Sequence, residues 1–452
     1  MRIVVVGDGK VGRTLTERLT LEGHDVMVID NSERALSEAT NTLDVMGICG
    51  NGASRQVQLE AGVDSADLLI AATSGDELNL LCCLVAKKLG ARHTIARVRN
   101  PEYSDQMSLI REELGLSMAV NPEFAAANEI FSILRFPAAL KVEKFNRGRV
   151  ELVELKLAED SPLDGMPLYN IYKKYQVKVL ICGVRRGGEV IIPGGDFVLR
   201  AGDKISFTAA PAEIQRFFRA VGIEIRSVGG AILVGGGRIA YYLTRLLSQI
   251  GIHPKIIDMD EARCRHLSEM FPKALIIHGD GTDQELLREE GLASADAFVA
   301  LTGLDEENII LSMYAASQGV GKVVTKVNRS SLVELVGSVG LDSIISPKDI
   351  TASQIVRYVR AMQNSLGSNV ETLYKIVGGA AEALEFRARE NFDIIGIPLK
   401  DLTLRPNLLV ACISRGRETI IPGGEDSIQI GDRVIVVTTN PQLNDLHDIL
   451  AR

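Results

Sequence analysis

Short apolar segments and helical patterns alternate along the first part of the chain, up to about Val120. The apolar run at residues 2–6 precedes Leu15, Leu19 and Leu21, which have helical spacing. Further apolar runs at residues 25–29, 44–49 and 67–72 predict the next three strands, and the fifth strand carries residues 96–99. Strands that alternate with helices predict a parallel sheet covered by helices, so this part of the chain is predicted to be a Rossmann-type α/β domain.

A different pattern follows Val120. Phe124, Ala127, Phe131 and Leu134 recur at steps of three and four, which predicts an amphipathic helix. Such a stripe is usually core, and a seam with another domain is the alternative. Because the α/β domain already has its helices, we expect this one to cross over to another part of the protein. From about residue 140 apolar and polar residues alternate between proline and glycine turns, which predicts a small α/β domain.

The chain repeats itself. The segment that begins at Gly7 recurs at Gly235, and the segment at residues 191–195 recurs at 420–424, so both pairs are separated by nearly the same stretch of chain. Two unlike segments that recur at nearly the same offset indicate a duplication. We therefore predict two tandem Rossmann-type, doubly wound domains, each followed by a small α/β C-terminal domain, over residues 1–136, 137–225, 226–365 and 366–452.

The turn after the first strand holds a glycine-rich motif at residues 7–12. Gly7 permits a tight turn, Gly9 lets the backbone approach a pyrophosphate, and Gly12 lets the helix pack closely on the strand. The phosphates would lie at the helix N-terminus, where unpaired N–H groups and the helix dipole favour an anion.

An acidic residue ends the second predicted strand. Asp30 follows the glycine motif at the end of this strand, where a carboxylate can accept hydrogen bonds from the 2′ and 3′ hydroxyls of an adenosine ribose and would repel a 2′-phosphate. A ligand related to NAD or ATP, rather than NADP, is therefore predicted. The alternative is a solvated residue that caps the next turn together with Asn31 and Ser32.

The ends of strands three to five supply further candidates, because ligands of open α/β sheets bind beyond the carboxyl ends of the strands. Asn51 can contact an adenine edge, and Thr73 and Ser74 can contact the phosphates or a second ribose. Arg97 is either a phosphate ligand or a surface charge. The first predicted site comprises Gly7, Asp8, Gly9, Lys10, Val11, Gly12, Asp30, Asn51, Thr73, Ser74 and Arg97.

The second copy is a variant of the first. Ala240 replaces the third glycine, Asp280 stands where the first copy has Asn51, and Lys326 stands in the place of Arg97. Because an acceptor has replaced an amide, we expect the two sites to differ in nucleotide preference. The second predicted site comprises Gly235, Gly236, Gly237, Arg238, Ile239, Asp258, Asp280 and Thr302.

Composition narrows the classes of function. The formal net charge of −8 argues against binding of nucleic acid, which requires a basic face. No apolar run approaches the roughly 20 residues that span a bilayer, and the first residues read as a strand rather than a signal peptide, so the chain is expected to stay in the cytoplasm. The six cysteines lack the spacing of a zinc site and are expected to be reduced and mostly buried.

Catalytic groups are not evident in the sequence. A dehydrogenase needs a proton donor or acceptor beside the nicotinamide, yet none of the six histidines falls at equivalent points of both copies or accompanies a catalytic pattern. The sequence therefore predicts no catalytic residue and no enzyme. An NAD-dependent oxidoreductase and a free-standing nucleotide sensor remain the alternatives to a regulatory protein.

With these motifs in place, the chain resembles the TrkA family, in which two domains that regulate potassium conductance lie in tandem. The resemblance covers essentially the whole chain. The matching segments are residues 7–12 with Asp30, 50–52, 71–79 and 96–101 in the first copy, and residues 235–240 with Asp258, 279–282 and 301–308 in the second.

The resemblance implies a cytosolic regulatory subunit that is peripheral on the inner face of the plasma membrane. Such subunits form dimeric or tetrameric rings beneath an integral-membrane potassium channel or transporter subunit of the Trk type. They change its gating with bound NAD(H), ATP or ADP. The resemblance puts Asp30 and Asp258 on the ribose and Arg97 near the phosphates.

Three further residues take their expected roles from related ring proteins. A basic residue at the position of Lys10 or Arg238 reaches a neighbour's triphosphate there, and this role suits Arg238 better because its guanidinium is bidentate. An acid at the position of Glu123 can take part in divalent cation binding in those relatives. Metal binding by this chain is therefore left open.

Overall fold

The structure is a computed structural model that describes residues 1–104, 106–145, 149–223, 228–341, 343–364, 370–376, 380–389, 393–416, 418–440, 443 and 445–451. It divides into two compact units. The parallel-sheet unit comprises Met1–Phe131 and Gly229–Val356, and the antiparallel-sheet unit comprises Ser132–Val228 and Arg357–Arg452. The domain boundaries predicted at 225/226 and 365/366 lie outside the described residues.

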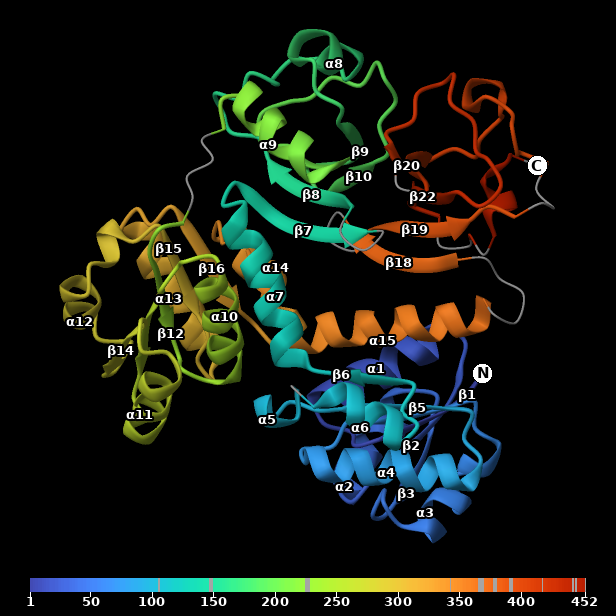
Figure 1. Cartoon of the computed structure of the whole chain (residues 1–452), viewed down its shortest axis with the longest axis vertical. Coiled ribbons are helices and arrows are strands. Elements are labelled where there is room, and N and C mark those ends of the chain that lie inside the picture. The colour runs from blue at the N-terminus through green and yellow to red at the C-terminus, as the bar shows by residue number, and fades with distance from the viewer. Residues whose placement is uncertain are drawn as a thin grey trace. The chain divides into compact units, whose positions relative to one another are not determined.

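The first sheet of the parallel-sheet unit has six strands in the order β3-β2-β1-β4-β5-β6, drawn in blue to cyan in Figure 1. Every neighbouring pair is parallel. The strands are β1 (Arg2–Val6), β2 (Asp25–Asp30), β3 (Met46–Cys49), β4 (Leu68–Ala71), β5 (His93–Arg97) and β6 (Met118–Val120). The helices are α1 (Lys10–Leu21), α2 (Glu33–Thr42), α3 (Arg55–Glu60), η1 (Val63–Ser65), α4 (Asp76–Leu89), α5 (Pro101–Ser104), α6 (Met107–Glu113) and α7 (Pro122–Arg135).

The second sheet repeats this topology in the order β14-β13-β12-β15-β16-β17. The strands are β12 (Ala231–Val234), β13 (Lys255–Asp258), β14 (Leu275–His278), β15 (Ala297–Ala300), β16 (Lys322–Lys326) and β17 (Ile344–Ile345). The helices are α10 (Arg238–Gln249), α11 (Glu261–Met270), α12 (Gln284–Glu289), η3 (Leu292–Ser294), α13 (Asp305–Ser317), α14 (Ser330–Ser338) and α15 (Pro347–Asn364). In β4 and β15 every residue is buried, as expected of parallel strands with helices on both faces. The predicted doubly wound fold and its duplication are therefore confirmed.

The last helix of each parallel sheet contacts the glycine-motif helix of the other. On α7 the ring of Phe124 lies 5.4 Å, centroid to centroid, from that of Tyr242 on α10. On α15 the carboxylate of Asp349 lies 2.5 Å from the guanidinium of Arg18 on α1. The predicted amphipathic helix is thus confirmed as α7, and Phe124 at the start of its apolar stripe lies in a seam between the two halves of the parallel-sheet unit.

The antiparallel-sheet unit also contains two related sheets, ordered β10-β9-β11-β8-β7 and β18-β19-β22-β20-β21. The first has β7 (Ala139–Phe145), β8 (Val150–Lys156), α8 (Tyr169–Tyr175), β9 (Leu180–Arg186), β10 (Glu189–Ile191), β11 (Lys204–Ala209) and α9 (Pro211–Ala220). The second has β18 (Val370–Ile376), β19 (Ala381–Arg387), η5 (Leu399–Asp401), β20 (Leu408–Arg415), β21 (Glu418–Ile420), β22 (Arg433–Thr438) and η6 (Leu446–Ile449).

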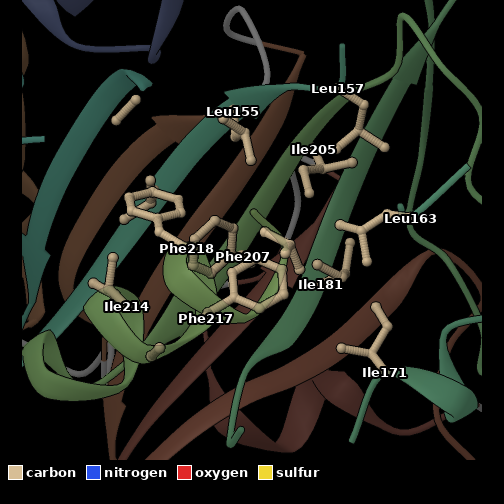
Figure 2. Packing of buried hydrophobic residues seen from close by; sticks show 14 of the residues in the cluster. Leu155, Leu157, Leu163, Ile171, Ile181, Ile205, Phe207, Ile214, Phe217 and Phe218 are labelled. Carbon is tan, nitrogen blue, oxygen red and sulfur yellow. The ribbon is translucent and has the colours of Figure 1, made fainter. Parts of the chain in front are cut away.

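Each antiparallel sheet has a core of its own. In the first, Phe217 and Phe218 of α9 pack edge-on against Phe207 of β11, with ring centroids 5.1 and 6.1 Å away (Figure 2). A buried aspartate follows the repeated turn of each copy: Asp203 pairs with Arg186 at 2.7 Å, and Asp432 pairs with Arg415 at 2.8 Å. This pair explains why the turn sequence before β11 recurs before β22.

The two antiparallel sheets share a third apolar cluster, which includes Leu152 and Cys182 from one and Ala411 and Cys412 from the other. The hydroxyl of Thr208 donates to the carbonyl oxygen of Ala411 at 3.0 Å. Five of the six cysteines are buried and Cys49 is exposed, and all six are free thiols. The prediction of reduced, mostly buried cysteines is confirmed.

Candidate functional site

The glycine turn after β1 has the geometry that its sequence predicts. Gly7 has a φ of +95°, and a Cβ there would lie 2.9 Å from the backbone of Thr73. A Cβ on Gly12 would lie 1.7 Å from the carbonyl oxygen of Gly7, whereas nothing lies within 4 Å of the corresponding position on Gly9. The tight turn at Gly7 and the close packing at Gly12 are confirmed. The open side of Gly9 is the one through which a phosphate would approach.

The helix that follows begins with unsatisfied backbone donors. Among the described residues, no side chain caps α1 at Gly9 or α10 at Gly237. Both helices have 12 residues, so their N-terminal amides carry the positive end of a substantial dipole. Two equivalent helix starts are therefore available to an anion in the parallel-sheet unit.

Asp30 lies directly beside the glycine turn. Its Oδ2 accepts a hydrogen bond from the amide of Asp8 at 2.6 Å, and its Oδ1 accepts one from the amide of Ser32 at 2.8 Å. The side chain is part-exposed. A carboxylate offers about four acceptor positions, so two remain for a ligand. Asp30 thus orders the turn with Ser32, as expected if it caps that turn. It also keeps two acceptor positions that could bind ribose hydroxyls.

Two residues of the motif contribute backbone rather than side chain to the crevice. The Asp8 carboxylate pairs with the guanidinium of Arg13 at 2.5 Å, and Arg13 also donates to the carbonyl oxygen of Ala35 at 2.9 Å. Burial raises the pKa of Asp8. Val11 is buried in the core. Asp8 and Val11 were predicted as site residues only because they lie within the glycine motif.

A buried amide ties together the ends of β4 and β5. Asn79 accepts from the backbone N–H of Thr73 at 2.8 Å and from its hydroxyl at 2.7 Å, and it donates to the carbonyl oxygen of Arg97 at 2.9 Å. Ser74 next to it is exposed, and its carbonyl oxygen accepts from Arg99. Thr73 and Arg97 are therefore held beside each other at the switch between β1 and β4, where the strand order reverses.

Arg97 is not a solvated surface charge. Its guanidinium donates to the carbonyl oxygen of Thr73, and the side chain is part-buried. The pKa of Arg97 is lowered to about 10, chiefly by burial and also by the charges of Arg99 and Arg238. The surface-charge alternative is therefore wrong, and the role of Arg97 as a phosphate ligand stays a prediction.

Asn51 has less freedom than the sequence suggested. Its Oδ1 accepts from the amide of Ala53 at 3.0 Å, which closes a small turn after β3, although the side chain remains exposed. In the second copy Asp280 closes the same turn by accepting from the amide and hydroxyl of Thr282, at 2.9 and 2.7 Å. These hydrogen bonds, the one from the amide first, lower the pKa of Asp280.

The second crevice has the same glycine turn as the first, but its carboxylate has an additional hydrogen-bond partner. Gly235 has a φ of +101°, Gly237 has open space at its Cβ position, and Ile239 and Ala240 are buried. Asp258 accepts from the amides of Gly236 and Asp260, at 2.6 and 2.8 Å. It also accepts from the guanidinium of Arg263, which lies 3.1 and 3.0 Å from its two oxygens.

The tip of β15 in the second copy repeats the amide network. Asn308 accepts from the amide of Thr302 at 2.8 Å and donates to the carbonyl oxygen of Lys326 at 3.0 Å. The Lys326 ammonium donates to the carbonyl oxygen of Thr302. Burial lowers the pKa of Lys326, as it does that of Arg97. Thr302 and Lys326 are therefore held together in the same way as their counterparts in the first copy.

The first residue of each glycine-motif helix is basic and acts electrostatically on groups of the other half. The positive charge of Arg238, the first residue of α10, acts on Arg97 and on Glu123 in the first half. The charge of Lys10, the first residue of α1, acts on Lys326 in the second half. Burial raises the pKa of Glu123, and its Oε2 has no hydrogen-bond partner among the described residues.

Sequence reasoning missed the residues that hold this arrangement together. Asn79 and Asn308 are fully buried and bridge the strand ends, and they occupy the same position in the two copies of the repeat. Asp76 accepts from the backbone amides of Arg99 and Asn100, and Asp305 makes the equivalent bonds in the second copy. The signal available in the sequence was that this asparagine and this aspartate both recur at the same spacing in the second copy.

Two features are absent from the ranges that the structure describes. No group of three or more His, Cys, Asp or Glu side chains is close enough to hold a metal ion. No helix there combines the length and the apolarity needed to cross a bilayer.

Comparison with known proteins gives the same division of the chain. The TrkA-N domain model matches residues 3–122 and 231–347, and the TrkA-C domain model matches residues 152–222 and 383–451. The structure of the GsuK channel bound to NAD has a similar fold. Its TM-score is 0.64 at 18% sequence identity, over 98% of this chain and 77% of that one.

Two archaeal relatives match over nearly their full length. The Trk system potassium uptake protein TrkA homolog 1 of Methanosarcina mazei is 33% identical over 444 residues, which cover 96% of this chain and 97% of the relative. The Trk system potassium uptake protein TrkA homolog of Archaeoglobus fulgidus is 33% identical over 449 residues, 99% of this chain and 100% of the relative. Both domain models match twice, in register with the repeat, and the chain therefore belongs to the TrkA family.

Proposed function

We propose that this chain is the nucleotide-binding regulatory subunit of a potassium-uptake system, and that nucleotides in its two crevices control an integral-membrane potassium channel or transporter subunit of the Trk type. The names of the full-length relatives support the potassium system. The subunit acts in the cytoplasm, at the inner face of the plasma membrane, as a dimeric or tetrameric ring.

The observation that carries this proposal is that a basic residue of each half acts electrostatically on the crevice of the other half. Arg238 lies close enough to Arg97 for its charge to lower the pKa of that guanidinium, and Lys10 acts likewise on Lys326. A polyphosphate in either crevice would offset positive charges from both halves of the parallel-sheet unit. Nucleotide binding is therefore coupled to the arrangement of the two halves, as a regulatory subunit requires.

The ligands that fit are NAD(H) and ATP or ADP. Asp30 has two acceptor positions for ribose hydroxyls, and the open face of Gly9 admits a phosphate to the start of α1. Arg97 stands at the adjacent strand end with a guanidinium suited to a second phosphate. The fold is also that of a channel whose structure holds NAD.

The subunit works by binding and not by turnover. A nucleotide that binds one arrangement of the ring better than another shifts the population by that difference, about 1.4 kcal/mol for each tenfold in affinity. A nucleotide that binds both arrangements equally shifts nothing. The crevices supply backbone amides, hydroxyls and paired charges, which are groups for recognition.

Calorimetric titration of the purified chain with NADH and ATP, separately and in competition, tests the proposal. We expect saturable binding of both, mutual competition and no consumption of NADH. Binding of neither nucleotide would remove it from the mechanism and leave a structural adaptor. Steady NADH oxidation with a small carbonyl compound would instead establish an oxidoreductase.

The partner is tested separately, by co-purification with a Trk-type potassium transporter and by potassium flux in vesicles that contain both proteins. We expect the flux to change when the nucleotide changes. A chain that binds nucleotide but neither co-purifies with the transporter nor alters its flux is a free-standing sensor.

A further inference from the structure

The two ribose-side carboxylates differ in how many of their acceptor positions the protein already uses. Asp30 accepts two hydrogen bonds, both from backbone amides. Asp258 accepts two equivalent bonds from Gly236 and Asp260, and a single guanidinium nitrogen of Arg263, Nη1, is shared between both of its oxygens. A carboxylate has about four acceptor positions, so the protein occupies more of those of Asp258 than of those of Asp30, of which two stay open.

Sequence differences around the two carboxylates produce this contrast. Arg263 is the third residue of α11, and the third residue of α2 is Ala35, which has no donor in its side chain. In the first half the nearby guanidinium comes from Arg13 on α1, and it pairs with Asp8 rather than with Asp30. The position corresponding to Asp8 is Gly236, which has no carboxylate to attract an arginine.

Two carboxylates of the protein hold the Arg263 side chain. Besides Asp258 it contacts the carboxylate of Asp260, 3.3 Å from its Nη2. The side chain is 45% exposed, whereas that of Asp258 is 7% exposed. The guanidinium therefore covers the carboxylate and can turn into solvent, whereas the carboxylate stays in place between the two backbone amides.

We propose that Arg263 is a specificity-determining residue of the second crevice, because it competes with the ribose hydroxyls of an adenosine nucleotide for the carboxylate of Asp258. The nucleotide gains its ribose contacts there only when the guanidinium turns away. The second crevice accordingly binds an ordinary adenosine nucleotide more weakly than the first. This inference rests on the proposed nucleotide-binding function and assigns the cause of a difference between its two sites.

Reciprocal substitutions in the full-length chain test the competition. Arg263→Ala is combined with Asp30→Ala, which weakens the first crevice, and binding of ADP and NADH is measured by calorimetry. We expect Arg263→Ala to tighten binding about tenfold in this background, an order-of-magnitude value for one shared charge-assisted contact made by a part-exposed guanidinium. Ala35→Arg, in a chain that also carries Asp258→Ala, is expected to weaken the first crevice by a similar factor.

A second variant distinguishes the loss of competition from a change in folding. Arg263→Gln keeps a long side chain on α11 without the charge, and it is expected to tighten ADP binding in the same direction as Arg263→Ala. Unchanged or weaker binding of ADP in both Arg263 variants overturns the inference. So does NADPH binding that exceeds NADH binding and is lost with Arg263→Ala, because the guanidinium would then hold a 2′-phosphate. Absence of nucleotide binding from the wild-type chain would instead contradict the proposed function.

Discussion

The hydroxyl of Tyr242 donates a hydrogen bond to the carbonyl oxygen of Arg99 at 3.0 Å, and so joins the two halves of the parallel-sheet unit. The same hydroxyl accepts from the side-chain amide of Asn121 at 2.9 Å. Tyr242 is 1% exposed, and burial raises its pKa. Because Arg99 follows β5 and Tyr242 lies on the glycine-motif helix α10, the bond links the end of a strand in one half to the glycine-motif helix of the other.

Tyr242→Phe removes this link and leaves the ring in place. The part-buried carbonyl oxygen of Arg99 and the side-chain amide of Asn121 each lose a partner, so we expect the free energy of unfolding to fall by about 1–3 kcal/mol. Thermal unfolding followed by circular dichroism measures the loss. Tyr241→Phe is the matched control, because the ring of Tyr241 packs against Phe271 and its hydroxyl takes no part in the seam. Equal melting temperatures for the two variants would contradict the assignment.

Asp30→Ala should weaken nucleotide binding in the first crevice. Loss of two hydrogen bonds from ribose hydroxyls to a charged acceptor is expected to cost about 1.5–3 kcal/mol of binding free energy. Calorimetry with NADH and ADP measures it. Asp67→Ala is the control, because Asp67 pairs with Arg92 and the amide of Arg2 at the other end of the sheet. If the affinity of the Asp30 variant is unchanged, Asp30 only orders the turn.

Asn79→Ala should disconnect the ends of β4 and β5. The substitution leaves the amide of Thr73 and the carbonyl oxygen of Arg97 without their buried partner, and we expect a loss of about 1–3 kcal/mol in the free energy of unfolding. Nucleotide affinity should fall as well, because Thr73 and Arg97 are no longer held together. Asn79→Asp keeps the acceptor but buries a carboxylate against the carbonyl oxygens of Thr73 and Arg97, so it should cost at least as much stability as Asn79→Ala. Circular dichroism and calorimetry on both variants check this order.

Glu123→Gln should change how stability depends on pH. Burial raises the pKa of Glu123 above its ordinary value of 4.5, so the folded protein binds this proton more tightly than the unfolded chain does. The protonated side chain therefore favours folding below about pH 4.5, and this contribution is lost as the pH rises through the folded pKa. Glutamine mimics the protonated acid at every pH. We expect the stability of Glu123→Gln relative to wild type to rise from pH 4 to pH 8.

Thermal unfolding at several pH values measures this trend. A wild-type chain that gains stability over Glu123→Gln as the pH rises would show that Arg97, Arg99 and Arg238 stabilise the carboxylate more than burial penalises it.

Much of the fold followed from short-range patterns in the sequence. Strand periodicity, the turn glycines and the ribose-side acids all act within a few neighbouring residues, so Gly7, Gly12 and Asp30 could be assigned before any tertiary contact was known. The strand limits were slightly too wide. The third and fourth strands, predicted at 44–49 and 67–72, are Met46–Cys49 and Leu68–Ala71. Asp67 directs its carboxylate to the amide of Arg2 and to Arg92 instead of extending β4.

The sequence by itself determined that the local motifs of a nucleotide site occur twice, because they recur in the same order and at nearly the same offset in the second half of the chain. Only the tertiary structure decided how those crevices relate. The approach of Arg238 to Arg97 depends on how two α/β halves dock, and the pairing of Arg263 with Asp258 depends on which neighbouring carboxylate is left without a partner. Hydrophobic periodicity reports which face of an element is buried, whereas these contacts depend on the direction of individual charged side chains in the packed protein.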